Sequence, residues 1–333
     1  MAFHLASNRP GRSLRGSDLP DLELRPWLDT QETLHRYLQI IGKVRLAKSP
    51  MTNHWWQVAL RVTSRGLTTG PMPAPKGCFS VDLDLLAHEL FIRTSEGAQV
   101  QMALEPRPVA EFYRDFISSV RGLGIPIAIN EIPQEIADDL TPFGQDTHHR
   151  SYDAAAVERW FHALVEAQLA LERFRADFTG KCSPVHFFWG GADLAVTRFS
   201  GRAAPSRADE GPLVAESYAE EVFSTGFWHG TPELGGAAFY AYAVPEPQGF
   251  STHARGLPDG AFYDRTLREF ILPWAALRAS TDPASMMQDF FQSTYRAAAD
   301  LGEWDREVLE RPLLAAPPQD SVPESPWHLS PSP

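Results

Sequence analysis

Cysteine is nearly absent from this 333-residue chain, which contains only Cys78 and Cys182. Two distant cysteines cannot form the paired C-x-x-C spacing of a zinc site, and they fit reduced thiols better than a disulfide framework. No apolar run approaches the roughly 18 residues of a membrane span. The N-terminus also lacks the apolar segment of a signal peptide. We therefore expect a cytoplasmic protein.

Positive charge is also scarce, with 30 lysines and arginines against 42 aspartates and glutamates, a net charge of −12. Such a balance repels polyphosphate, so we expect neither nucleic acid nor a membrane surface as a partner. The motifs G-x-G-x-x-G, the Walker loop, G-x-S-x-G and H-E-x-x-H are missing. Their absence removes the common nucleotide-binding, serine-hydrolase and zincin interpretations.

Hydrophobic residues make up 43% of the chain and charged residues 22%, as in a globular protein. Both ends differ from this average: residues 1–21 show no periodicity, and residues 311–333 contain seven prolines. We expect these ends to be disordered tails. The remainder divides into a first repeat, residues 22–147, and a second repeat, residues 148–310, with long loop insertions.

Two hydrophobic periods describe the elements between the tails. Apolar residues three and four positions apart predict helices, and alternation with a period of two predicts strands. The expected helices are Leu34–Ile41, Val109–Val120, Asp153–Phe178 and Asp282–Leu301. The expected strands are Trp55–Val62, Phe79–Leu83, His88–Ser95, Ala98–Leu104, Val185–Trp189, Asp193–Ser200, Ala238–Val244 and Glu269–Trp274.

Short motifs recur in order through the two halves. The motifs Gly42-Lys43, Ser49-Pro50, His54-Trp55-Trp56 and Val62-Thr63 return as Gly180-Lys181, Ser183-Pro184, His186-Phe187-Phe188 and Val196-Thr197. We expect an α+β fold in which an internal duplication gives two helix–antiparallel meander–helix units around a pseudo-two-fold axis. Residues 42–123 should then superpose on residues 180–301.

His54 and His186 are the first candidate catalytic residues, because the repeat places both at equivalent strand starts followed by aromatic residues. An imidazole among apolar rings can serve as an acid, a base or a metal ligand. The alternative is a histidine that only hydrogen-bonds the backbone at a strand entrance. We expect His186, more than His54, to face the main cavity, since the long insertions belong to its repeat.

Glu221 and Glu246 are the candidate carboxylates. Glu221 precedes the string Phe227-Trp228-His229, and Glu246 lies between two prolines in a stiff loop. Solvated surface glutamates are the alternative. Cys182 is four residues from His186, a separation of roughly 13 Å in extended chain, so a buried inert thiol is favoured over a Cys–His pair.

Basic and aromatic residues complete the expected substrate site. Lys181 and Arg198 could hold an anionic group, although a helix C-terminus and a surface ion pair explain them equally well. Trp56, Tyr240 and Tyr242 would line the pocket wall. Tyr240 and Tyr242 share one strand face, and small alanines occupy the other, where something bulky could approach. His148 and His149 read as residues of a solvated linker.

Four strings resemble an uncharacterised, largely bacterial family, domain of unknown function 5996. They are NHWWQVALRVTSRGLTTG, GKCSPVHFFWGGADLAVTRFSG, FYAYAVPEP and QSTYRAAADLGEWDR. The likeness covers about Leu24 to Glu310. It implies one intact bacterial cytoplasmic unit and carries over no catalytic residue.

These residues favour a cytoplasmic small-molecule enzyme that uses His/carboxylate acid–base or metal chemistry in an aromatic-lined pocket. A divalent metal is the candidate cofactor, and a small molecule is the expected partner. A non-catalytic small-molecule-binding module is the alternative, and an interaction protein that recruits partners through its proline-rich tail is the third. Convergent ionisable groups in one cleft would favour the enzyme, and an apolar cleft the binding module.

Overall fold

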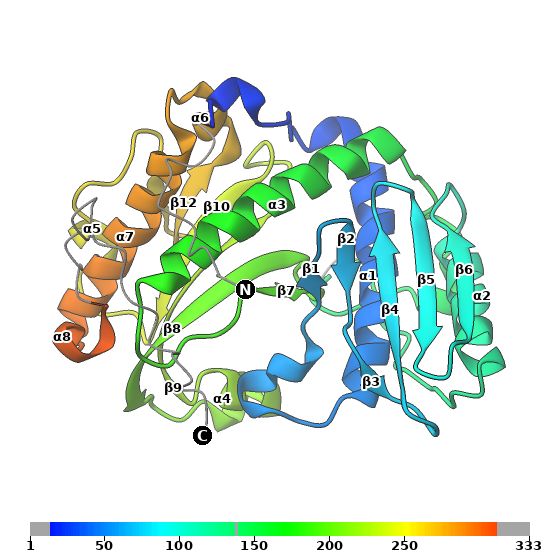
Figure 1. The fold of residues 1–333 in the computed structure, drawn as a ribbon. Coiled ribbons are helices and arrows are strands. Elements are labelled where there is room, and N and C mark those ends of the chain that lie inside the picture. The colour runs from blue at the N-terminus through cyan, green and yellow to red at the C-terminus, as the bar shows by residue number, and fades with distance from the viewer. Residues whose placement is uncertain (1–13, 137–138, 312–333) are drawn as a thin grey trace, which may run out of the picture.

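The computed structural model describes residues 14–136 and 139–311 (Figure 1). The four expected helices are confirmed, and two begin at the predicted caps. The Asp153 carboxylate accepts hydrogen bonds from the amides of Ala155 and Ala156, and the Asp282 carboxylate accepts one from Ser285. The long helices are α1 (Leu28–Lys48), α2 (Val109–Gly122), α3 (Ala154–Ala176) and α7 (Pro283–Leu301).

The first sheet is an antiparallel meander in the order β1-β2-β4-β5-β6, with β3 paired to β4. Along β4 every second side chain is buried, as the period of two predicts. Helices α1 and α2 pack beside it (Figure 1). The rings of Tyr37 of α1 and Phe112 of α2 are stacked, with centroids 3.9 Å apart. Its strands are β1 (Arg61–Val62), β2 (Gly66–Thr68), β3 (Met72–Pro73), β4 (Cys78–Asp84), β5 (Glu89–Thr94) and β6 (Gln99–Ala103).

The second sheet is also antiparallel, in the order β11-β12-β10-β9-β8-β7. Helices α3 and α7 pack on one of its faces, where Phe174 of α3 contacts Phe223 of β9 and Phe291 of α7 contacts Phe239 of β10. Its strands are β7 (His186–Phe188), β8 (Asp193–Ala203), β9 (Glu220–Trp228), β10 (Ala238–Val244), β11 (Phe262–Asp264) and β12 (Glu269–Pro273).

The small face of β10 meets a helix. Ala241 and Ala243 belong to the main core, on the side that α7 covers. The bulky element expected at this face is therefore α7.

The shorter helices are η1 (Gly16–Asp18), η2 (Arg25–Trp27), η3 (Asn53–Val58), η4 (Phe143–Gln145), η5 (Ala208–Glu210), α4 (Pro212–Ser217), α5 (Phe250–His253), α6 (Trp274–Ala279) and α8 (Arg306–Leu309).

The two sheets join edge to edge. Leu60 and Phe187 exchange both backbone hydrogen bonds, at 2.9 and 3.0 Å, next to β1 and within β7. One hydrophobic cluster extends from Leu14 to Leu309 and includes residues of both sheets. The two predicted repeats therefore share a single core.

The strand predicted at 55–62 is wrong over most of its length. Residues 53–58 form the 3-10 helix η3, in which His54 and Trp55 have φ angles of 56° and 60°, and only Arg61–Val62 is strand. The reason is a tertiary contact: the Nδ1–H of His54 donates to backbone carbonyls of Glu216 and Ser217 at 3.1 and 3.2 Å. This contact overrides the local period of two.

The α+β class is confirmed, since the chain combines long helices with antiparallel sheets, but the second sheet is not a simple meander because β10 pairs with β12 and not with β11. The predicted superposition is wrong at the residue level, because Trp56 lies in η3 whereas Phe188 lies in β7. Gly42 also lies inside α1, whereas Gly180 follows α3. The internal duplication and its pseudo-two-fold axis are not confirmed.

Part of the expected N-terminal tail is packed. Leu14 and Leu19 are buried, the amide of Gly16 donates to Ser280 O at 3.2 Å, and Asp21 pairs with Arg278 at 2.8 Å. The boundary at residue 21 is therefore too late, because apolar residues without helical spacing still reach the core. The remaining tail residues, 1–13 and 312–333, lie outside the described residues.

Within the described ranges, no helix combines the length and apolar character that crossing a membrane requires.

Candidate functional site

A cavity of about 730 Å³ lies on the face of the second sheet opposite α3 and α7. The strand register explains its floor: Tyr240 is opposite Gly226, which is opposite Ala195, and Tyr242 is opposite Ser224. Since side chains alternate between the faces of a sheet, these residues share the face away from the helices. The floor is built from β8, β9, β10 and the start of β12.

Aromatic residues form much of the cavity wall. Four of the nine tryptophans of the chain line it, namely Trp55, Trp56, Trp189 and Trp228. Trp55 and Trp56 come from η3, whose two left-handed residues present the consecutive rings to the cavity. The indole N–H of Trp189 donates to Val58 O at 2.9 Å and ties two walls together. Non-glycine residues in the left-handed conformation of His54 and Trp55 are uncommon, and they gather at functional sites.

Three carboxyl groups line the cavity, those of Asp193, Glu269 and Glu135. Burial, followed by the nearby Glu135 charge, raises the pKa of Asp193 from 3.8 to about 7. Burial, followed by the Asp193 charge, raises the pKa of Glu269 from 4.5 to about 7. Partial burial also raises the pKa of the more exposed Glu135. No lysine or arginine is among the described residues that line the cavity.

Asp193 is held by Tyr240. The Tyr240 hydroxyl donates to the Asp193 carboxylate, and its ring lies over Gly226. A Cβ atom at position 226 would lie 2.4 Å from the Tyr240 ring and 2.0 Å from Leu194 O, so only glycine fits. Burial raises the pKa of Tyr240 well above its ordinary value, so its phenol stays a neutral donor.

A row of hydroxyls continues across the floor. Thr197 and Ser224 are hydrogen-bonded at 3.0 Å, and Tyr218 of the chain before β9 is bonded to Tyr242 at 3.1 Å. The rings of Tyr240 and Tyr242 are stacked, with centroids 6.0 Å apart. The floor therefore offers hydroxyl groups along a row that runs from Thr197 of β8 across β9 and β10 toward β12, under apolar walls.

His54 lines the cavity, but both of its ring nitrogens are engaged. Nδ1–H donates to the carbonyls of Glu216 and Ser217, and Nε2 accepts from the Lys181 ammonium at 2.6 Å. Lys181 also pairs with Glu220. Both ring nitrogens therefore have partners within the protein, and neither is free to take a substrate proton.

His186 does not line the cavity, contrary to the expectation that it would face it more than His54 does. The Trp56 ring packs on both histidines: its centroid lies 5.4 Å from that of the His54 ring and 5.9 Å from that of the His186 ring. His186 is 1% exposed, and neither of its ring nitrogens has a hydrogen-bond partner among the described residues. Burial, followed by the charges of nearby arginines, lowers its pKa to about 3. The prediction failed because η3 folds over the start of β7.

The other predicted site residues divide into two groups. Trp56, Tyr240 and Tyr242 line the cavity, as expected, and Lys181 reaches its edge through His54. Glu221, Glu246 and Arg198 do not line it; each is engaged elsewhere. Glu221 pairs with Arg202 at 2.6 Å, Glu246 pairs with Arg268 at 2.8 Å, and the Arg198 guanidinium lies 3.5 Å from the Phe174 ring on the opposite face of the sheet.

Two smaller expectations concern thiols and metals. Burial raises the pKa of the Cys182 thiol to about 11, which fits the inert thiol that was predicted. Within the part of the chain that the structure describes, no group of three or more His, Cys, Asp or Glu side chains is placed to hold a metal ion. The divalent metal therefore has no identified set of ligands.

The buried polar face of α1 positions two segments of the cavity wall. Gln39 donates to Gln134 O at 2.6 Å and accepts from Gln134 N at 2.7 Å. The Nε2–H of His35 donates to Gly190 O at 2.7 Å, and burial lowers the His35 pKa to about 4, so the ring stays neutral. Both contacts fix backbone next to cavity-lining residues.

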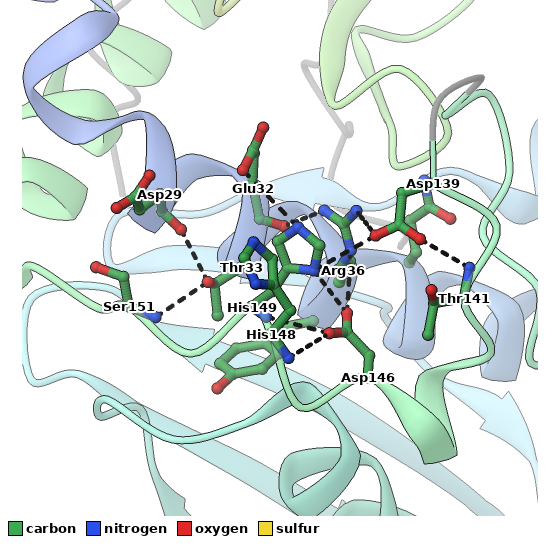
Figure 2. A network of polar contacts seen from close by, with 12 residues as sticks. Asp29, Glu32, Thr33, Arg36, Asp139, Thr141, Asp146, His148, His149 and Ser151 are labelled. Carbon is green, nitrogen blue, oxygen red and sulfur yellow. Dashed lines mark hydrogen bonds and ion pairs between the residues drawn. The ribbon is translucent and has the colours of Figure 1, made fainter.

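Next to His35 on α1, Arg36 anchors the chain that follows this wall. Its guanidinium lies between the carboxylates of Asp139 and Asp146, at 3.1 and 3.2 Å (Figure 2). Asp146 also accepts from the Nδ1–H of His149 at 2.8 Å. His149 thus belongs to a buried network, where the sequence suggested a solvated linker.

Comparison with known proteins gave one result. Residues 19–311 match the model of a family described as a family of unknown function, DUF5996. No curated protein and no solved structure matches the chain.

Proposed function

We propose that this chain, which belongs to the DUF5996 family of unknown function, binds a small molecule in the aromatic cavity and acts on it by acid–base chemistry. The observation that carries the proposal is the placement of the Asp193–Tyr240 pair on the floor of a cavity of about 730 Å³. A cavity of this size accommodates a metabolite-sized ligand.

Asp193 is the proposed proton-transfer group. With a pKa of about 7, it populates both protonation states near neutral pH, which suits a general acid or base. The Tyr240 hydroxyl fixes one carboxylate oxygen and stabilises the charged form by donating to it. Glu269, with a pKa of about 7, is the second group that can hold or release a proton in the same cavity.

The acid–base chemistry expected from the sequence is kept in this proposal, but different residues carry it. Carboxylates and a tyrosine replace the histidines, because His54 has both nitrogens engaged and His186 lies beneath Trp56. His54 instead becomes a positioning residue, since it joins η3 to α4 and so places Trp55 and Trp56 on the cavity.

A non-catalytic binding module is the second candidate. The wall made of four tryptophans favours it, because such a surface binds apolar or cationic groups without any chemistry. In that case Asp193 and Glu269 contact the ligand but no bond changes. The third candidate, an interaction protein with a recruiting tail, depends on residues outside the described ranges.

A thermal-shift screen of small molecules of varied charge tests the proposal. Cavity ligands should stabilise the wild type and stabilise Asp193→Asn or Glu269→Gln by a different amount. Glu111→Gln, an exposed carboxylate of α2, is the matched control and should behave as wild type. Product formation followed by NMR for each cavity ligand then separates the two candidates: turnover that Asp193→Asn abolishes indicates the enzyme, and binding without turnover indicates the module. A screen without any ligand sensitive to these substitutions would contradict both.

A further inference from the structure

The charges around the cavity are one-sided. Asp193, Glu269 and Glu135 line it, and no lysine or arginine does so among the described residues. Asp193 has one side-chain partner, the neutral Tyr240 hydroxyl. Among the described residues, neither Glu135 nor Glu269 forms a side-chain hydrogen bond or an ion pair. Cavity carboxylates without cationic partners are therefore available to a ligand.

Three carboxylates near the cavity differ from those inside it. They have basic partners within the protein, in the pairs Glu220–Lys181, Glu221–Arg202 and Glu246–Arg268. The contrast matters most on β12 and the turn before it, where Arg268 turns to Glu246 and leaves the adjacent Glu269 to the cavity. When Glu269 is ionised, the described residues supply no positive charge beside it.

The walls suit the same kind of ligand. Trp55, Trp56, Trp189 and Trp228 line the cavity together with Tyr218, Tyr240 and Tyr242. The faces of tryptophan and tyrosine rings attract organic cations, and the attraction is strongest where water is excluded. An aromatic wall above unpaired carboxylates offsets the free-energy cost of moving a cation from water into the cavity.

We infer that the ligand of this cavity is an organic cation, a protonated amine or a quaternary ammonium group attached to an apolar or aromatic body. The inference rests on the proposed function, because it names the ligand class of the same cavity. Among the described lining residues, an anionic ligand would meet three carboxyl groups and no lysine or arginine. Lys181, at the edge, is already held by Glu220 and His54. A neutral ligand would leave the cavity carboxylates without a counter-charge.

Proton release gives the inference a signature beyond affinity. Asp193 and Glu269 are partly protonated near pH 7, and a bound cation favours their charged forms. Asp193 faces Tyr240 and Glu135, and Glu269 faces Asp193 and Asp264, so no cation among the described residues supplies this effect. Binding of a cation at pH 7 should therefore release protons, and its affinity should rise between pH 6 and pH 8.

A charge series on one ring system tests this. Tryptamine is a cation, tryptophol is its neutral analogue and indole-3-acetate is its anionic analogue; choline and 3,3-dimethylbutan-1-ol form the corresponding quaternary pair. By isothermal titration calorimetry, at least one cation should bind about tenfold more tightly than its neutral analogue, with indole-3-acetate weakest. Titrations in buffers of different ionisation enthalpy should show proton release for the cation and none for the neutral analogue.

Three isosteric variants locate the effect. Asp193→Asn, Glu269→Gln and Glu135→Gln should each weaken cation binding by about three- to tenfold and leave neutral binding unchanged. Unchanged binding of the neutral analogue also shows that the variant is folded. Glu135 is exposed, so its variant keeps the test valid if a substitution on the floor disturbs folding. Glu111→Gln should change nothing.

The outcomes separate the inference from the proposed function. Equal binding of cation and neutral analogue, or cavity ligands from the screen that are all neutral or anionic, overturns the inference and leaves the cavity as a ligand site. Cation binding that is insensitive to all three variants also overturns it. The absence of any ligand sensitive to cavity substitutions overturns the proposed function as well.

Discussion

The hydroxyl of Tyr240 donates to the carboxylate of Asp193 across the backbone of Gly226, so three adjacent strands share one polar contact. The contact requires that β9 has no side chain where the ring crosses it. A single glycine in the middle of a strand thus connects the packing of the sheet to the chemistry of the cavity.

Gly226→Ala should therefore destabilise the protein. The new Cβ would lie 2.0 Å from Leu194 O and 2.4 Å from the Tyr240 ring, so both the sheet and the ring must shift. We expect a loss of about 2–4 kcal/mol of unfolding free energy. Chemical denaturation measures it. Gly122→Ala is the control, because a Cβ there meets nothing in an exposed helix end, and it should be neutral or slightly stabilising. Equal stability of the two variants would contradict the packing described.

Stability should fall as the pH rises through neutrality, because of Asp193. Its pKa is about 7 in the folded protein against an ordinary 3.8, so the folded state binds the proton more tightly. This contribution is fully present below about pH 4 and is lost as the pH rises through 7. Asp193→Asn, which stays neutral, should be more stable than wild type by about 1–3 kcal/mol at pH 8 and similar to it at pH 4. Denaturation at both pH values measures this. A variant less stable than wild type at pH 8 would contradict a raised pKa.

Buried histidines should have the opposite pH dependence. Burial lowers the pKa of His35 to about 4 and that of His186 to about 3, so their contribution is present above pH 6.5 and lost as the pH falls through the folded values. His186→Phe should reduce this acid sensitivity without lowering stability at pH 7, since neither ring nitrogen of His186 has a hydrogen-bond partner in the described part of the chain. Thermal melts from pH 4 to pH 7 measure the slope. His162→Gln, on an exposed face of α3, is the control and should keep the wild-type slope.

His35→Gln separates the two buried histidines. His35 donates to Gly190 O, so replacing it should cost about 1–3 kcal/mol at pH 7, whereas His186→Phe should not. If His186→Phe were as destabilising as His35→Gln, the imidazole of His186 would have a partner that the structure does not show.

Helices and most strands could be predicted because their signals are local. Asp153 and Asp282 cap the helices where the sequence predicts caps, and the range Ala238–Val244 is strand as expected. The failures are tertiary in origin. Residues 55–58 belong to a stretch that alternates like a strand, but they lie in η3, because His54 binds α4, which is distant in sequence.

The two tyrosines of the floor were predictable and the acidic groups of the cavity were not. Tyr240 and Tyr242 share a face in any strand assignment, so their side by side placement follows from the sequence. Asp193 and Glu269 stand at the starts of predicted strands, but they meet in one cavity only because the strand order is β8-β9-β10-β12. Strand β9 was not predicted, so this order could not be derived from the sequence.

Removing Arg36 should release the chain segment that α1 holds. Its guanidinium pairs with Asp139 and with Asp146, which is 1% exposed, so Arg36→Met leaves a buried carboxylate with only part of its partners (Figure 2). We expect a loss of about 3 kcal/mol or more, because an uncompensated buried charge is costly. Hydrogen exchange should quicken at residues 139–149 while β4 and β5 stay protected. Arg114→Met, which removes an exposed ion pair with Asp115, should cost less than about 1 kcal/mol. If the two arginine variants had equal stability and equal exchange, the network around Arg36 would not hold this segment.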